Sequence, residues 1–339
     1  MRKILEEICS LPGISGREDI VRDYIISKIE GYCDYQIDNL GSIIAFKKGK
    51  KPAKNKVMID AHMDEVGMIV TGVDSNGFIK FAFVGGVDTK VIIGRNVRIG
   101  KDNIPGVLGI KPIHLVDKAD ESKIPSSDSL YIDIGAKDKE EALKYVSLGE
   151  EIHFESEFVE FGNGFIKSKA IDDRAGCAMM IDLIRSDLEY DCYFSFSVQE
   201  EIGLRGANAT AYTIAPDYAI VVETTTAADI NDAKGEERVC VCGEGGAISF
   251  MDRATVYNID LFNKALQVAK EKNIKAQPKT RVAGGNNAGA IHKSRGGVKV
   301  LTVSVPTRYL HSPCCVCKYE DIESSRDIVK AMAEELASC

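Results

Sequence analysis

The chain has 339 residues, of which 45% are hydrophobic and 28% are charged, and this is ordinary for a globular protein large enough for two domains. Its formal net charge is -8 and it has no basic tract, so we expect it to bind neither nucleic acid nor an anionic membrane. It shows no apolar signal core and no membrane-length apolar run, which predicts a cytoplasmic protein. We expect its ten cysteines to be reduced.

The first part of the chain shows helical and then strand-forming patterns. One helix is predicted near residues 3–9. Ser15 and Glu18 form a capping-box pattern that predicts the start of a second helix, which would reach about Glu30. Strands are predicted near residues 32–38, 42–47 and 56–60.

The pattern changes between residues 67 and 161. Short β-type runs are separated there by Gly, Asp and Pro, with little helical periodicity apart from a stretch near residues 139–146. This pattern predicts an inserted β-rich domain, either a small barrel or a sandwich.

Helical and strand patterns alternate after residue 170. The predicted helices cover residues 173–188, 206–213, 258–272, 289–293 and 319–337. Such alternation is typical of a three-layer α/β domain with a mixed, mostly parallel sheet. Residues 1–66 and 162–339 would therefore form one discontinuous domain, and residues 67–161 the insert.

Two adjacent carboxylates, Glu200 and Glu201, follow the apolar run at residues 192–198. That run is predicted to be a buried strand, and ligands bind at the C-terminal edge of the strands in α/β sheets. Neighbouring like charges are costly there unless a positive charge neutralises them, and the nearest basic residue is Arg205. A metal ion is the simplest neutralising group.

Other side chains that can bind a metal ion also lie at or shortly after the ends of predicted strands. His62 ends one predicted strand, Glu223 ends another, and His311 follows a third at residues 298–305. Polar residues often end strands because the chain emerges into water, but that explains only one or two of these and not a set that fits one coordination sphere. Together with Glu201, these side chains could bind two metal ions, each held by one histidine and one glutamate. Nitrogen and oxygen ligands of this kind suit Zn, Co or Mn.

Three further residues would complete a hydrolytic site with two metal ions. Asp64 lies two residues after His62 and would fix the tautomer of that imidazole. Asp172 or Asp173, at a helix start, would bridge the ions, and spacing alone barely separates the two. Glu200 would take the proton of the attacking water and pass it to the leaving amine.

Several other candidates have simpler interpretations. Asp60, inside an apolar strand, could contact a metal ligand without binding the ion itself. Three histidines end no strand at this edge and are interpreted as surface or packing residues: His114, His153 and His292. A cluster of cysteines is interpreted as apolar packing near the floor of the site rather than as a thiolate metal site: Cys314, Cys315 and Cys317.

Four segments in this order resemble the M42 family of metallo-aminopeptidases, some of whose members carry the name endoglucanase: residues 61–67, 169–176, 198–206 and 308–312. The similarity runs from the first helix to the last and includes the insert. It implies a zinc-peptidase-like α/β catalytic domain, an inserted β-barrel-like dimerisation domain, and short peptides as substrates. It also implies self-association into dimers and hollow tetrahedral dodecamers.

The resemblance also implies roles for individual residues. By motif position, two divalent ions, Zn most of all, would be held by His62, Asp172, Glu201, Glu223 and His311. The family pattern makes Asp172, not Asp173, the bridge, Glu200 the general base, and Asp64 the catalytic aspartate behind His62. Two positions depart from the pattern, because many relatives carry Asp at the position of Glu223 and commonly carry Asp at that of Asn287.

The leading hypothesis is a metal-dependent aminopeptidase, and two alternatives remain. A glycoside hydrolase needs only two carboxylates, but it leaves His62 and His311 unexplained, and the chain has no Trp to stack on sugars. An inactive cage-forming scaffold that binds metal would need neither Glu200 nor Asp64.

Overall fold

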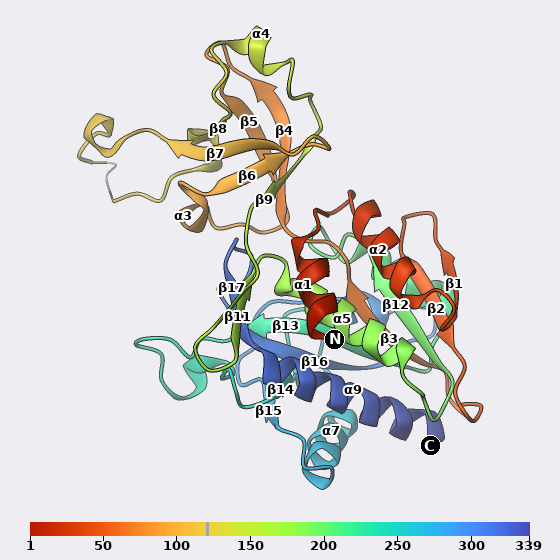
Figure 1. Cartoon of the computed structure of the whole chain (residues 1–339). Helices are drawn as coiled ribbons and strands as arrows, with labels where there is room; N and C mark the ends of the chain where they lie inside the picture. The colour runs from red at the N-terminus through yellow and green to blue at the C-terminus, as the bar shows by residue number, and fades with distance from the viewer. Residues whose placement is uncertain (120–121) are drawn as a thin grey trace.

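The computed structural model describes residues 1–119 and 122–339. An 11-stranded sheet forms the larger body of the molecule, and a closed six-stranded barrel forms a smaller body that projects from it (Figure 1). This architecture confirms the predicted α/β fold with a β-barrel-like insert, and it decides between the barrel and the sandwich.

The large sheet is mixed, with its parallel strands at the centre. Four parallel neighbours form that centre: β12 (Cys192–Ser197), β3 (Val57–His62), β13 (Tyr218–Thr226) and β16 (Lys299–Arg308). Antiparallel strands extend it on one side: β2 (Ile43–Lys47) and β1 (Asp34–Ile37). On the other side lie β17 (Cys315–Lys318), β11 (Phe165–Ser168) and β10 (Val159–Phe161). Two short strands extend from β16: β14 (Gly246–Ile248) pairs with β16, and β15 (Ala276–Pro278) pairs with β14.

Helices cover both faces of this sheet, because its strands are apolar on both sides. Ile43 and Ala45 of β2 pack in one core, whereas Ile44 between them packs in the other. The first core is shared with α1 (Arg2–Ser10), α2 (Asp19–Ile29), α5 (Ile171–Arg185), α7 (Ile259–Glu271) and α9 (Tyr319–Ser338). The second is shared with α6 (Arg205–Ile214) and α8 (Ala288–Ile291). Within the described parts of the chain, no helix has the length and apolar character needed to cross a membrane.

The barrel has its own apolar core, which includes Met68, Val97 and Leu108. Its antiparallel strands are β4 (Gly67–Val73), β5 (Ile79–Val84), β8 (Leu130–Asp133), β7 (Ile104–Ile110), β6 (Asn96–Ile99) and β9 (Glu151–Phe154), in spatial order. The short helices α3 (Thr89–Ile92) and α4 (Lys139–Ala142) lie between them in the chain. Strand β10 belongs to the large sheet, so the barrel strands end at Phe154, before the predicted boundary at residue 161.

The predicted capping box at Ser15 and Glu18 is wrong. Helix α2 begins at Asp19, and Glu18 precedes it without a side-chain cap. The Ser15 hydroxyl donates instead to Asp64, and the Glu18 carboxylate accepts from the backbone amides of Gly16 and Gln199. The Ser15 side chain is therefore directed toward the segment that follows β3, and the Glu18 side chain contacts the segment that follows β12.

Candidate metal centre

The register of the central strands brings His62 and Glu223 to the same level. Strands β3 and β13 pair in parallel up to Asp60 and Val221, and continuing that register by two residues aligns His62 with Glu223. Because side chains alternate along a strand, both point to the same side. The sheet edge predicted from the apolar runs is therefore the place where these side chains meet.

Loops and a helix start supply the remaining side chains. Glu200 and Glu201 follow β12, and the carbonyl of Glu200 accepts from the amides of Gly203 and Leu204 in the turn before α6. Asp172 lies in the first turn of α5, where its backbone angles are not helical. His311 lies between β16 and β17 with a φ of 55°, a left-handed conformation that is uncommon outside glycine.

Asp172 lies between two groups of side chains. Its Oδ1 is 3.3 Å from His62 Nε2, which is in turn 3.5 Å from Glu223 Oε1. Its Oδ2 is 3.5 Å from His311 Nε2, which is 3.4 Å from Glu201 Oε2. Each of the two oxygens of one carboxylate thus faces its own histidine–glutamate pair.

These separations fit the coordination of metal ions. A tetrahedral zinc site with bonds of about 2.0–2.1 Å places neighbouring ligand atoms about 3.3–3.4 Å apart. The four distances around Asp172 are 3.3–3.5 Å. In both groups, the three ligand atoms lie within 4.8 Å of one another. The donor set of imidazole nitrogen and carboxylate oxygen suits Zn, Co or Mn.

The charges of the cluster call for a cation. Burial, and then the charge of Asp172, raises the pKa of Glu201 to about 8. Burial likewise raises the pKa of Glu223 to about 7 and that of Glu200 well above its usual value. Burial alone would lower the pKa of His62, but Glu223, Asp172 and Asp64 raise it well above its usual value. The carboxylates therefore need added positive charge to be ionised together near neutral pH.

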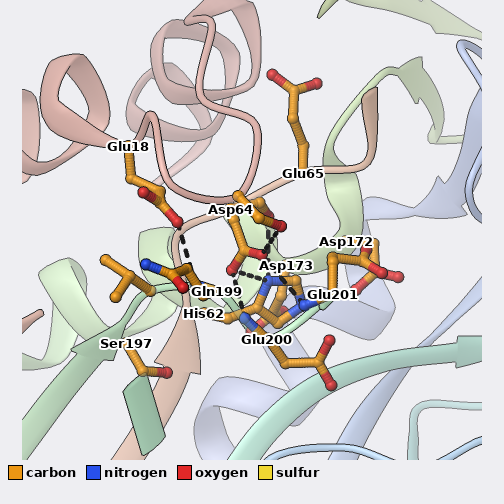
Figure 2. Close-up of polar contacts among 12 residues, drawn as sticks. Glu18, His62, Asp64, Glu65, Asp172, Asp173, Ser197, Gln199, Glu200 and Glu201 are labelled. Carbon is orange, nitrogen blue, oxygen red and sulfur yellow. Dashed lines mark hydrogen bonds and ion pairs between the residues drawn. The ribbon is translucent and has the colours of Figure 1, made fainter. Parts of the chain in front are cut away.

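Asp64 contacts several members of the cluster (Figure 2). Its carboxylate accepts from the backbone amides of Glu200 at 3.0 Å and Glu201 at 3.1 Å, and from the Ser15 hydroxyl at 2.6 Å. His62 Nδ1 lies 3.0 Å from the backbone carbonyl oxygen of Asp64 and 3.4 Å from its carboxylate. Asp64 thus contacts both His62 and the pair of glutamates.

Asp172 and Asp173 have different surroundings, although they are adjacent in the chain. Asp173 Oδ1 accepts from the amide of Gly176 at 3.0 Å. Its Oδ2 is buried and has no hydrogen-bond partner among the described residues. Among the residues that the structure describes, Asp173 belongs to none of the three-residue groups that could hold a metal ion. Of the two aspartates, it is therefore Asp172 whose oxygens face His62 and His311.

The cluster lies in a cavity of about 410 Å³. Its walls come from the end of β13, from β16, and from residues 279–286, which follow β15. Thr224, Thr225 and Thr226 line one side, and Ala283, Gly284 and Gly285 line another. Lys279 and Asn286 also line the cavity.

Other predicted candidates lie outside the cluster. His114 is exposed, His153 is buried in β9, where burial lowers its pKa to about 4, and His292 contacts the carbonyl of Ala288 on its own helix. All ten cysteines are free. Cys315 and Cys317 are buried, which agrees with the packing interpretation, whereas Cys314 is partly exposed.

Asn287 does not line the cavity. It is buried behind the sheet edge, where its Nδ2 donates to Asp60 Oδ2 at 2.7 Å and to Ser197 Oγ at 2.8 Å. Asn287, which departs from the family pattern, thus links β3 and β12 through Asp60 and Ser197. The neighbouring Asn286 is the one that reaches the cavity wall.

Sequence reasoning missed three groups of residues at this site. Ser15 and Glu18 were interpreted as helix caps, so their contacts to Asp64 and Gln199 were not predicted. Lys279 carried no motif. Gly86, in the segment after β5, lies against His311, since a Cβ there would stand 3.6 Å from His311 Nδ1.

A sheet edge where histidines and carboxylates gather around one aspartate is the arrangement of a metal-dependent hydrolase. A family model described as M42 glutamyl aminopeptidase matches residues 41–328. The chain belongs to the M42 peptidase family. It is a peptide hydrolase of the aminopeptidase type, and membership of this family implies divalent metal ions.

Curated relatives match over nearly the whole chain. A protein of Acetivibrio thermocellus, provisionally named an aminopeptidase, is 37% identical over 99% of this chain and 98% of its own. A lysyl aminopeptidase of Pyrococcus furiosus is 34% identical over 99% of this chain and 96% of its own. A glutamyl aminopeptidase of Lactococcus lactis is 30% identical over 98% and 95%.

Solved structures show the same fold. An aminopeptidase from Desulfurococcus kamchatkensis has a TM-score of 0.93 and 32% identity, covering 98% of this chain and 94% of its own. The TET1 peptidase of Pyrococcus horikoshii, which can assemble into a tetrahedron or a large octahedral shell, has a TM-score of 0.87 and 32% identity over 99% of each chain. A Thermotoga maritima protein named an endoglucanase has a TM-score of 0.80 and 36% identity, covering 98% and 96%.

Proposed function

We propose that this protein is an aminopeptidase with two metal ions that removes N-terminal residues from short peptides. One observation carries the proposal: the two oxygens of Asp172 each face a separate histidine–glutamate pair at distances of 3.3–3.5 Å. A single-metal site would use one such pair. Two ions at about 3.5–4 Å from each other form the usual hydrolytic arrangement.

Five side chains would hold the ions. His62 and Glu223 would bind one, His311 and Glu201 would bind the other, and Asp172 would bind both. Zn²⁺ fits this donor set best, and Co²⁺ and Mn²⁺ are also compatible with it. When bound, such a pair polarises the scissile carbonyl and lowers the pKa of a water molecule.

Glu200 is the proposed general base. It lines the cavity beside His62 and Glu201, but the two groups centred on Asp172 do not include it. It would take the proton of the attacking water and deliver it to the leaving amine. Asp64, through the amides of Glu200 and Glu201, would hold both glutamates in place while it orients the ring of His62.

The same chemistry would restrict cleavage to the N-terminal residue of a peptide substrate. A free α-amine can be a neutral nitrogen ligand in the site while the adjacent carbonyl is activated. An acetylated amine cannot. The proposed enzyme should therefore hydrolyse aminoacyl substrates with a free amine and leave their acetylated counterparts intact.

The experiment that tests this function uses pairs of aminoacyl p-nitroanilides, with the amine free or acetylated, before and after chelation. Cleavage of the free-amine members alone, lost with the chelator and restored by Zn²⁺, Co²⁺ or Mn²⁺, supports the proposal. A soluble β-glucan is the parallel substrate, because one related structure is named an endoglucanase. Glucan cleavage that survives chelation would instead support the glycosidase alternative.

We further propose that the barrel mediates self-association into dimers and larger shells. Large apolar side chains are exposed on the barrel and on the segments between its strands: Val107, Ile113, Leu115, Ile124 and Leu148. The shells formed by the Pyrococcus horikoshii relative support this assembly. Light scattering on the purified protein would give a dodecamer mass if the proposal holds and a monomer mass if it does not.

A further inference from the structure

Three consecutive backbone amides lead into the proposed active site, and each donates to a buried carboxylate (Figure 2). The amide of Gln199 donates to Glu18 Oε1 at 3.0 Å. The amides of Glu200 and Glu201 donate to the two oxygens of Asp64 at 3.0 and 3.1 Å. The proposed mechanism gives Asp64 a role and leaves Glu18 without one.

Glu18 is a buried acid that has no basic partner in the described parts of the chain. Only 5% of the residue is exposed. The basic side chains nearest to it in the sequence are engaged elsewhere, since Arg17 donates to a backbone carbonyl and Arg22 pairs with Asp19 and Asp23. A carboxylate is costly to bury unless hydrogen bonds replace its hydration. Backbone amides must therefore stabilise this group.

The two amides that donate to Glu18 come from separate segments of the chain. Its Oε1 lies 2.8 Å from the amide nitrogen of Gly16 and 3.0 Å from that of Gln199. Gly16 lies in the loop between α1 and α2, whereas Gln199 lies between β12 and α6. One oxygen atom thus joins the N-terminal loop to the segment that contains the proposed general base.

Gln199 has a backbone conformation that needs such support. Its φ is 57°, in the left-handed region, which is unfavourable for a residue with a Cβ atom. Leu204, near the other end of the same turn, also has a φ of 57°. The amide of Arg205 donates to the carbonyl of Gln199 at 3.2 Å and closes the turn. The hydrogen bond to Glu18 therefore stabilises a left-handed residue directly before Glu200.

We propose that Glu18 is a positioning residue for Glu200. The inference rests on the proposed aminopeptidase function, in which Glu200 is the general base. By accepting from the amide of Gln199, Glu18 would fix the direction in which the chain enters the turn. Asp64 would fix the next two residues in the same way. A general base must lie within hydrogen-bond reach of the proton that it removes, so a small displacement of the turn would lower kcat.

Three substitutions separate the reach of the Glu18 side chain from its charge. Glu18→Leu has a similar volume but no acceptor, Glu18→Asp keeps the charge but is one methylene shorter, and Glu18→Gln keeps both the reach and an acceptor oxygen. We expect kcat for a free-amine aminoacyl p-nitroanilide to fall about 10–100-fold in Glu18→Leu, because small misplacements of catalytic groups have effects of this size. Glu18→Asp should also lose activity, and Glu18→Gln should retain most of it. KM and bound metal should not change.

The decisive comparison removes the general base as well. If Glu18 acts through Glu200, its loss has no further effect once Glu200 is replaced, because the effects of residues that act as a unit are not additive. The double variant Glu18→Leu/Glu200→Gln should therefore be no slower than Glu200→Gln alone. A purely structural contribution of Glu18 would instead lower the rate by the same factor in both backgrounds.

A matched control and a second variant protect the test. Glu30→Leu replaces an exposed glutamate at the C-terminal end of α2 and should leave kcat unchanged. If Glu18→Leu does not fold, Glu18→Asp takes its place in both backgrounds, because it keeps the charge and most of the volume. Circular dichroism and metal analysis on every sample establish that the compared full-length proteins are folded and loaded.

Three outcomes would overturn the inference. One is a wild-type kcat in the folded, metal-loaded variant that lacks the Glu18 contact. Another is an equal loss of rate in the wild-type and Glu200→Gln backgrounds. The third is a loss of bound metal in Glu18→Leu, which would show that the effect reaches the metal ligands. All three leave the aminopeptidase function intact, because the wild-type enzyme still cleaves free-amine substrates. If that function itself is wrong, no aminoacyl substrate is hydrolysed under any metal condition.

Discussion

The Ser15 hydroxyl donates a hydrogen bond of 2.6 Å to Asp64 Oδ2, and both residues are buried. This contact joins the segment before α2 to the carboxylate that holds the backbone of Glu200 and Glu201. The proposed general base and one proposed metal ligand are therefore positioned through a residue distant from them in the chain.

Ser15→Ala should lower kcat about tenfold while the protein keeps its bound metal. The reason is that a hydrogen bond to a charged group contributes about 1.5–3 kcal/mol, and its loss leaves Asp64 less firmly oriented. Steady-state kinetics and metal analysis on the same sample check this. Ser10→Ala is the control, because the exposed Ser10 hydroxyl donates to the carbonyl of Glu7 in its own helix. An unchanged kcat in Ser15→Ala would show that the contact has no part in positioning.

Glu200→Gln should reduce kcat by about 10²–10⁴, the usual contribution of a general base. Metal content should stay at the wild-type value, because the proposed ligands are all other residues. Rate measurements together with elemental analysis of the variant separate the two effects. Glu6→Gln, on the exposed side of α1, is the matched control. Full activity in Glu200→Gln would remove the general-base assignment.

Asp172→Asn should impair binding of both metal ions, whereas Glu223→Gln and Glu201→Gln should each impair only one. This difference follows from the geometry, since only Asp172 belongs to both histidine–glutamate groups. Elemental analysis after dialysis at matched metal concentrations would measure it. If Asp172→Asn lost no more metal than Glu223→Gln, the bridging role would be wrong.

The stability of the metal-free protein should depend on Glu18 between pH 4.5 and 7. Burial, and then the charge of Asp64, raises the pKa of Glu18 from 4.5 to about 7. The native state thus binds this proton more tightly than the unfolded state does, so the contribution is full below the unfolded pKa and is lost as pH rises through the folded one.

Glu18→Gln removes this titration but keeps an oxygen for the amides of Gly16 and Gln199. The unfolding free energy of the wild type should fall relative to the variant by up to about 3 kcal/mol over that pH range. Urea unfolding at several pH values, with chelator present, measures this difference. Parallel pH curves for the two proteins would contradict the expectation.

Much of the sheet and the cluster could be predicted because both depend on short-range patterns. Apolar runs locate the central strands, and the carboxyl ends of parallel strands meet at one edge, so His62 and Glu223 were expected together. Ser15 could not be found this way. Its spacing to Glu18 is the same as that of a helix cap, and only the tertiary contact with Asp64 distinguishes the two.

Lys279 was missed for a different reason. It follows a three-residue strand, β15, that pairs with another three-residue strand, β14, and such short elements leave no periodic signal. Its place in the cavity depends on how the chain after β15 returns to the sheet edge. Side chains that reach a site from irregular segments in this way become visible only in the folded structure.

The most direct test of the central claim is to titrate metal into the chelated protein and follow hydrolysis of a free-amine aminoacyl p-nitroanilide together with bound metal. We predict no hydrolysis without metal, full activity as two ions bind per chain, and no cleavage of the acetylated substrate at any occupancy. Activity that persists without metal, or equal cleavage of the acetylated substrate, would contradict the proposed aminopeptidase site with two metal ions.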